Sequence, residues 1–324
     1  MGSVIQVQGL VKKFGELTAV DGITFEVEEG EFFGFLGPNG AGKSTTINIL
    51  STLLKPTSGS ARLAGFDVVM EPNQVRRAIG MVFQDPSLDD RLTAEENLVF
   101  HSMLYDVPRR ERMERIARVL EMVGLTDRRK SIVRTFSGGM KRRLEIARGL
   151  MHYPKVLFLD EPTAGLDPQT RRAIWDHIRK LREEIGITVF MTTHYLDEAE
   201  NCGRIAIIDH GKIQALDSPA NLKRRVGGDV IIVSGDDQLM QDLSNRYNVG
   251  VQQVDGGYHF QVASGAEFVP RVVMDFKERV KSIQVKQPSL DDVFLQLTGR
   301  AIREEEGTEK DQMRQGLKLW RGRR

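Results

Sequence analysis

A glycine-rich octapeptide constrains this chain more than any other feature. Residues 37–44 read Gly-Pro-Asn-Gly-Ala-Gly-Lys-Ser, which matches the phosphate-loop pattern G-x-x-x-x-G-K-[ST]. The continuous apolar run before it, residues 32–36, predicts a strand covered on both faces, and residues 45–54 after it predict a helix. Glycines let successive backbone N–H groups turn inward around an anion, and the helix points its positive end at the same place. We therefore expect a nucleotide-phosphate site formed by Gly37, Pro38, Asn39, Gly40, Ala41, Gly42, Lys43, Ser44 and Thr45.

Two acids at the end of a second apolar run extend this prediction. Residues 156–159 read Val-Leu-Phe-Leu and lead into Asp160 and Glu161. In a phosphate-loop protein, Lys43 reaches the β- and γ-phosphates of ATP, while Ser44 and Asp160 hold Mg²⁺ directly or through water. Glu161 is then placed to polarise a water molecule for attack on the γ-phosphate. Alone, such acids would be interpreted as a solvated strand end, but after a phosphate loop they predict a catalytic site.

The remaining periodicity predicts an α/β fold, a P-loop NTPase core. Alternating residues 4–10 and 23–27 predict half-buried antiparallel strands. Further strands and helices are expected at residues 79–83, 109–123, 156–159, 169–184, 187–191 and 204–208. The helix at 109–123 would bury one stripe, made of Met113, Ile116, Leu120 and Val123.

A second domain is expected after a glycine pair at residues 227 and 228. The pattern there predicts the order βαββαβ, with elements at residues 229–233, 237–247, 249–254, 258–262, 266–280 and 282–285. This order is the ferredoxin-like arrangement, and a short helix at 290–297 closes it. We therefore expect a nucleotide-binding domain over residues 1–226, a small α+β accessory domain over 227–299 and a charged, frayed tail over 300–324. The accessory domain could support dimer contacts, sense a ligand or act as a stabilising cap.

Composition limits the partners that the chain can be expected to bind. The net charge of +1 gives no overall field that favours nucleic acid or anionic lipid. The one cysteine, Cys202, excludes an internal disulfide and fits a reducing compartment as a small buried residue. No apolar run reaches about 18 residues, and the N-terminus lacks a signal-peptide pattern. If the protein serves a membrane, we expect it to do so from the surface.

A second glycine-rich segment, Phe136-Ser-Gly-Gly-Met140, decides which family the chain resembles. Ser137, Gly138 and Gly139 open a predicted helix through residues 141–151, and a helix start of this kind is a second anion site. One γ-phosphate does not need two such sites in one subunit. The segment resembles the LSGGQ signature of ABC ATPases, with Phe136 for Leu and Met140 for Gln. The resemblance implies an antiparallel β subdomain, a helical subdomain and a head-to-tail dimer in which the signature of one copy closes on the ATP of the other.

Smaller motifs occur in the order and at the spacing of that family. The resemblance implies that Gln84 touches Mg²⁺ and the attacking water, that Asp167 contacts the opposite subunit and that Phe14 stacks on adenine. His194 matches the switch histidine that contacts the γ-phosphate. The catalytic set implied is therefore Glu161, His194, Gln84 and Lys43. The other histidines match no motif and are interpreted as structural.

Longer strings narrow the resemblance. Ser137-Gly-Gly-Met-Lys-Arg-Arg-Leu144, Thr192-Thr-His-Tyr-Leu-Asp-Glu-Ala-Glu200 and Pro288-Ser-Leu-Asp-Asp-Val-Phe-Leu-Gln-Leu-Thr298 are similar to the daunorubicin-resistance-type ATPases of ABC-2 exporters. Those ATPases pair with a separate membrane permease and export drugs, lipids or polysaccharides. The resemblance implies a place at the cytoplasmic face of the membrane, reached through the permease, and no nucleic-acid partner.

One alternative from another class stays open at this point. It is a non-transport ABC ATPase that acts on nucleic acid or ribosomes. Chromosome-maintenance members place a long coiled coil between the two glycine-rich motifs, whereas residues 45–135 show no sustained heptads here. Translation-associated members carry two cassettes in one chain, and this chain has one phosphate loop.

Overall fold

The computed structural model describes residues 2–85, 87–236, 238–254 and 257–299. The expected tail, residues 300–324, lies outside the described residues. The chain divides into two compact units, and the division falls between Leu216 and Asp217.

An antiparallel sheet opens the first unit. Its order is β2-β1-β4-β5, and β1 is antiparallel to both neighbours. The strands are β1 (Ser3–Phe14), β2 (Leu17–Glu28), β4 (Ser58–Leu63) and β5 (Phe66–Asp67). Apolar residues from Val4 to Leu10 of β1 and from Val20 to Val27 of β2 are buried while most of the residues between them are not, because alternate side chains in a strand point to opposite faces. The two predicted half-buried strands are thus confirmed.

A six-stranded sheet carries the strand ends on which the site is built. Its order is β10-β9-β3-β8-β7-β6, and the neighbours from β9 to β6 are parallel. The strands are β3 (Phe32–Leu36), β6 (Ile79–Val82), β7 (Val156–Asp160), β8 (Thr188–Thr193), β9 (Arg204–Asp209) and β10 (Lys212–Asp217). Every residue of β3, β7 and β8 is buried, as a continuous apolar run predicts for a parallel strand. In this order β8 lies between β3 and β7, so the carboxyl ends of these three strands are adjacent.

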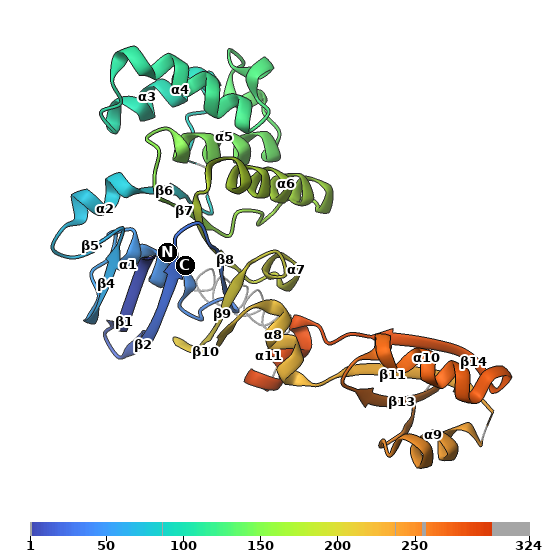
Figure 1. Ribbon diagram of the computed structural model, residues 1–324. Coiled ribbons are helices and arrows are strands. Elements are labelled where there is room, and N and C mark those ends of the chain that lie inside the picture. Colours follow the sequence, from blue (N-terminus) through green and yellow to red (C-terminus); the bar gives the residue numbers. More distant parts are fainter. Residues whose placement is uncertain (1, 86, 237, 255–256, 300–324) are drawn as a thin grey trace, which may run out of the picture. The chain divides into compact units, whose positions relative to one another are not determined.

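Helices cover the six-stranded sheet and build a separate helical region (Figure 1). Those of the first unit are α1 (Lys43–Leu50), α2 (Pro72–Ala78), α3 (Ala94–Leu104), α4 (Arg109–Met122), α5 (Gly138–Leu150), α6 (Pro168–Ile185) and α7 (Leu196–Ala199). Helices α3 and α4 lie on the side of α5 away from the sheet (Figure 1). The P-loop core with its β and helical subdomains is therefore confirmed. Within the described ranges, no helix is both long and apolar enough to cross a membrane.

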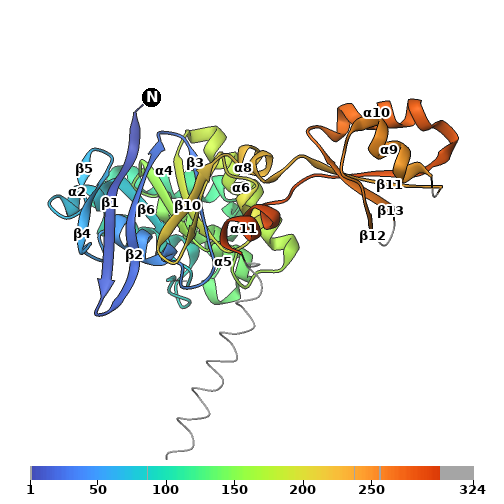
Figure 2. The same cartoon turned by 90° about the horizontal axis from the view of Figure 1, so that it is seen from below.

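The second unit contains the predicted βαββαβ order. It begins with α8 (Pro219–Val226) and continues through β11 (Asp229–Gly235), α9 (Leu239–Tyr247), β12 (Gln252–Val254), β13 (Gly257–Val262), α10 (Gly265–Phe276), β14 (Val280–Lys286) and α11 (Leu290–Thr298). The sheet order is β12-β13-β11-β14 with antiparallel neighbours. Both α9 and α10 lie on one side of this sheet (Figure 2). They enclose a core of Ile231, Val233, Leu239, Leu243, Tyr258, Phe260, Val272 and Phe276.

Three details of the helices differ from the predictions. Helix α1 ends at Leu50 rather than at residue 54, because Ser51 closes it and Thr52 adopts a left-handed φ of 67°. Helix α10 ends at Phe276, where Lys277 has a φ of 41°, so Val280 begins a strand instead. Met113 is 44% exposed, whereas Val119 on α4 is fully buried. The predicted stripe is therefore buried from Ile116 onward but not at its first residue.

Candidate functional site

The loop between β3 and α1 has a backbone that only glycine fits well. Gly42 is the N-cap of α1 with a φ of 105°, and a Cβ atom there would lie 2.5 Å from the carbonyl oxygen of Ala19. Gly37 at the start of the loop donates its N–H to the carbonyl of Thr193, the last residue of β8. No described side chain caps the first turn of α1. The start of such a helix, where the first N–H groups have no carbonyl partner within the helix, is a place where an anion can bind.

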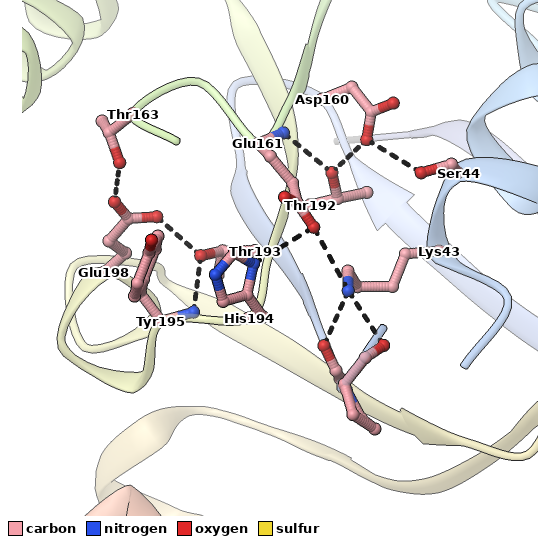
Figure 3. Close-up of polar contacts among 12 residues, drawn as sticks. Lys43, Ser44, Asp160, Glu161, Thr163, Thr192, Thr193, His194, Tyr195 and Glu198 are labelled. Atoms are coloured by element: carbon pink, nitrogen blue, oxygen red, sulfur yellow. Dashed lines mark hydrogen bonds and ion pairs between the residues drawn. The ribbon is translucent and has the colours of Figure 1, made fainter. Parts of the chain in front are cut away.

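Lys43 is buried, and its side chain points toward the start of this loop. Its Nζ donates to the carbonyls of Gly37 at 2.7 Å and Pro38 at 3.0 Å, and lies 3.3 Å from Oε1 of Glu161 (Figure 3). The ammonium is thus held between the loop and the end of β7. The positive charge of Lys43 is therefore already positioned to contact a phosphate group bound in the loop.

Asp160 and Ser44 bring two oxygens together at the carboxyl edge of the sheet. The Ser44 hydroxyl donates to Oδ1 of Asp160 at 3.4 Å, and Thr192 on β8 donates to the same oxygen at 2.5 Å (Figure 3). Burial raises the pKa of Asp160, although the Thr192 hydrogen bond opposes this. A buried carboxylate beside a hydroxyl is a donor set that suits a hard cation such as Mg²⁺, which usually takes only one or two protein oxygens.

Glu161, the next residue, is turned toward the loop by an unusual backbone. Its φ is 45°, a left-handed conformation that is uncommon for a residue with a side chain. Its N–H donates to the carbonyl of Thr192 at 3.2 Å and lies 3.1 Å from the Thr192 hydroxyl. These bonds tie Glu161 to β8, so that its side chain does not continue the alternation of β7.

The Glu161 carboxylate is held ionised although it is buried. Nδ1 of His194 lies 3.2 Å from the same Oε1 that Lys43 approaches (Figure 3). Burial alone would raise the pKa of Glu161, but the neighbouring His194 ring and the charge of Lys43 outweigh it and lower this pKa. An ionised carboxylate is the form that accepts a proton from water.

The second glycine-rich segment begins α5, a different element. Ser137 is the N-cap and its Oγ accepts the N–H of Met140 at 3.3 Å. Ser137 and Gly138 are exposed, whereas Phe136 is buried, so the aromatic residue at that position packs into the interior. A Cβ atom on Gly139 would lie 2.4 Å from Cγ2 of Thr170 on α6, and this close approach requires glycine.

The other predicted site residues lie on separate elements. Phe14 ends β1 with 47% of its surface exposed, and Gln84 is exposed just after β6. Asp167 is the N-cap of α6, where it accepts the N–H groups of Gln169 and Thr170, and the bonds from Thr170 lower its pKa. The structure therefore brings together Lys43, Ser44, Asp160, Glu161 and His194, and gives Asp167 a capping role within its own chain.

Comparison with known proteins identifies this arrangement. Residues 20–164 match the ABC transporter family, and residues 218–298 match the family described as "ATP-binding protein DrrA1-3-like, C-terminal domain". The linearmycin resistance ATP-binding protein LnrL of Bacillus subtilis is 40% identical over 93% of this chain and 100% of its own length. The chain is an ABC transporter ATPase. The daunorubicin/doxorubicin resistance ATP-binding protein DrrA of Streptomyces peucetius is also 40% identical, over 91% of this chain and 92% of its own.

Solved ABC cassettes share the fold of the first unit. The cassette MJ0796, solved as a dimer in a post-hydrolysis state with ADP and Pi, is 32% identical with a TM-score of 0.59, covering 66% of this chain and 98% of that one. The cassette cbiO1 of Clostridium perfringens is 27% identical with a TM-score of 0.65, covering 76% and 97%. The family is one of ATP-hydrolysing subunits, so this ABC ATPase binds ATP and hydrolyses it.

Glu198 is a buried carboxylate of this ABC ATPase that no sequence motif marks. Glu198 accepts hydrogen bonds from the hydroxyls of Thr163 and Thr193, the second at 2.6 Å (Figure 3). Burial raises its pKa, and the two threonine bonds oppose this. Thr163 lies in the loop after β7, and Thr193 is the last residue of β8, directly before His194. Glu198 therefore connects the segments that follow these two strands. Its spacing of four residues from His194 was visible in the sequence, but nothing there showed that it is buried.

Proposed function

We propose that this ABC ATPase powers export through a separate ABC-2-type membrane permease. The relatives reported above are named for resistance to linearmycin, daunorubicin and doxorubicin, and the match runs through the second unit as well as the cassette. The exported substrate would belong to the same broad classes, a drug, a lipid or a polysaccharide. The non-transport alternative draws no support from these names.

The cluster around Glu161 is the observation that carries the catalytic part of the proposal. Residues 37–45 hold the phosphates of ATP, with Lys43 on the β- and γ-phosphates. Glu161 orients the attacking water and accepts its proton, and His194 stands beside both Glu161 and the γ-phosphate. Ser44, Asp160 and Gln84 would hold Mg²⁺, which neutralises charge that develops on the phosphate oxygens. His194 and Lys43 lower the pKa of Glu161, which favours the ionised form that accepts the proton from water.

A second copy completes each site in this proposal. Ser137, Gly138 and Gly139 of one copy approach the γ-phosphate bound to the other, and Ser137 and Gly138 are exposed at the start of α5. Asp167 lies at the same interface, and Phe14 stacks on adenine. Binding of two ATP molecules closes the dimer and hydrolysis opens it.

Helix α3 offers the surface that we assign to the permease. Phe100, Met103 and Leu104 at its end are 61%, 57% and 64% exposed. The loop that follows Gln84 is fixed to the same helix, because the N–H of Asp89 donates to Oδ1 of Asn97 at 2.9 Å. If a cytoplasmic segment of the permease packs on these apolar residues, movement of that loop would be transmitted to it through α3. The ATPase would then sit at the cytoplasmic face of the membrane through this contact.

A pull-down tests the transporter assignment. The Glu161→Gln chain, which should hold ATP without turning it over, is used to capture partners from detergent-solubilised native membranes with ATP and Mg²⁺. We expect a multi-helix membrane protein near one-to-one with the bait, read by mass spectrometry. The matched control is Glu161→Gln with Phe100→Ser and Leu104→Ser, which should lose that partner while it still binds ATP. Recovery of only ribosomal or DNA-bound proteins would overturn the transporter assignment.

A further inference from the structure

Helix α5 carries a buried charged pair that the proposed mechanism does not use. Arg142 and Glu145 lie one turn apart, with side chains 7% and 0% exposed. Nη1 of Arg142 lies 3.0 Å from Oε2 of Glu145. Burying two charges costs free energy that their attraction often fails to recover, so such a pair is weak evidence for a role in stability alone. The other contacts of Arg142 and Glu145 indicate a different role.

Arg142 donates to the backbone at the end of β7. Its Nη2 lies 3.0 Å from the carbonyl oxygen of Glu161 and 3.4 Å from that of Asp160, and its Nε donates to the carbonyl of Pro162. Three consecutive carbonyls thus share one guanidinium. A planar group with five N–H donors in a fixed fork is well suited to hold such a turn.

The turn that Arg142 holds is the strained one. Glu161 has a φ of 45°, and a left-handed residue with a side chain is strained and persists only where its surroundings impose that conformation. The Thr192 bonds fix the N–H of Glu161, while Arg142 fixes its carbonyl and those on both sides. The direction of the Glu161 side chain depends on this backbone conformation.

The same pair reaches the segment around Gln84. Nη1 of Arg142 also donates to the carbonyl of Phe83, the residue before Gln84. Oε1 of Glu145 accepts the N–H of Ser87 at 2.8 Å, and Arg148 donates to the carbonyl of Ser87 at 2.7 Å. One helix face therefore binds both the Glu161 turn and residues on either side of Gln84, namely Phe83 and Ser87.

We propose that Arg142, supported by Glu145, is a positioning residue for Glu161 and links it to the first turn of α5 and to the loop after β6. Arg142 lies five residues after Ser137 on the same helix. If contact with a second copy moves that helix, the guanidinium moves with it and displaces the Glu161 carbonyl to which it donates. The pair acts on catalysis through the backbone of Glu161. This inference rests on the proposed catalytic role of Glu161.

The test replaces both charges together, because loss of Arg142 alone would leave Glu145 buried without its partner. In Arg142→Met/Glu145→Leu we expect kcat for ATP hydrolysis to fall at least tenfold, while KM, nucleotide affinity and the unfolding temperature change little. The matched control is Arg115→Met/Glu111→Leu, which removes a 2.7 Å ion pair from α4 and should keep full activity. If the double variant does not fold, Arg142→Lys keeps the pairing charge but cannot span the carbonyls, and the same fall in kcat is expected. Unchanged kcat in a folded variant overturns the proposal.

A second background separates positioning from a general structural effect. In the Glu161→Gln chain, the Arg142→Met/Glu145→Leu change should reduce the residual rate by less than twofold, because a residue that acts through Glu161 has nothing left to position. A further tenfold loss there would contradict the inference. Near-normal hydrolysis by Glu161→Gln alone would instead overturn the proposed function, so the two failures are distinguishable.

Discussion

At the residue scale, the ionisation of one buried carboxylate decides what this site can do. Glu161 lies between Lys43 and His194, both within 3.3 Å of its Oε1. Burial favours the protonated acid, and these two neighbours reverse that preference. Asp160, one residue earlier, has threonine and serine hydroxyls for partners instead, and its pKa is raised. Adjacent acids therefore differ in pKa because their neighbours differ.

Removal of His194 should shift the pH dependence of hydrolysis. Without the His194 ring beside Oε1, the pKa of Glu161 rises, so the carboxylate is protonated at a higher pH as the solution is acidified. In His194→Ala we expect kcat to fall at least tenfold and its acid limb to move to higher pH. A pH series of steady-state rates measures both. An acid limb that stays in place would show that His194 does not hold Glu161 ionised.

At the element scale, the sequence predicted the elements that apolar runs mark and missed the polar ones. Strand β3 matches its predicted residues, and β7 and β8 do so within two residues, because a parallel strand that is covered on both faces must be continuously apolar. Strand β4 reads Ser-Gly-Ser-Ala-Arg-Leu and shows no such signal. Met113 was predicted to be buried but is 44% exposed. Periodicity identifies which face of a helix is apolar, but it does not show how much of the helix length is covered by neighbouring elements.

The close approach of α5 and α6 gives a prediction at this scale. Alanine for glycine inside a helix normally stabilises by about 0.5–1 kcal/mol, but a Cβ atom on Gly139 would lie 2.4 Å from Cγ2 of Thr170. We therefore expect Gly139→Ala to destabilise the protein by about 1–3 kcal/mol in urea unfolding. Adding Thr170→Ser removes Cγ2 and keeps a hydroxyl for Asp167, so it should restore most of the loss. No recovery in the double variant would mean that the contact is not the cause.

The candidate site could be predicted only in part, for a physical reason. Lys43, Ser44, Asp160 and Glu161 follow from motifs at strand ends, and His194 from a resemblance, because strand order places these ends side by side. Arg142 contacts carbonyls at least 18 residues away in the sequence, and Glu198 links nearby Thr193 to Thr163, which is 35 residues away. No local pattern reveals such contacts, because they depend on how α5 and α7 pack. The assignments of Phe14, Gln84 and Asp167 to nucleotide, metal and partner stay predictions.

At the scale of the whole molecule, two units have separate hydrophobic cores. The first is centred on rings such as Phe33, Phe35, Phe158 and Phe190, and the second on Tyr258 and Phe260 beneath α9 and α10. The residues that bind and hydrolyse ATP in our proposal all belong to the first. Damage to the second core should therefore leave the chemistry intact.

Phe260→Ala tests this independence. Phe260 is 3% exposed, and loss of such a ring costs about 3–5 kcal/mol. We expect calorimetry to show one unfolding transition moved to lower temperature, with nucleotide affinity unchanged. Loss of ATP binding in the folded variant would show instead that the second unit supports the site.

In the proposed mechanism two copies share their ATP sites, and sedimentation of the Glu161→Gln chain tests this directly. With ATP and Mg²⁺ we predict a dimer that retains two nucleotides, and with ADP a monomer. Adding Ser137→Arg, which fills the exposed start of α5, should give monomers that still bind ATP. A Glu161→Gln chain that binds ATP yet stays monomeric, or a dimer that Ser137→Arg does not disrupt, would contradict the shared-site mechanism.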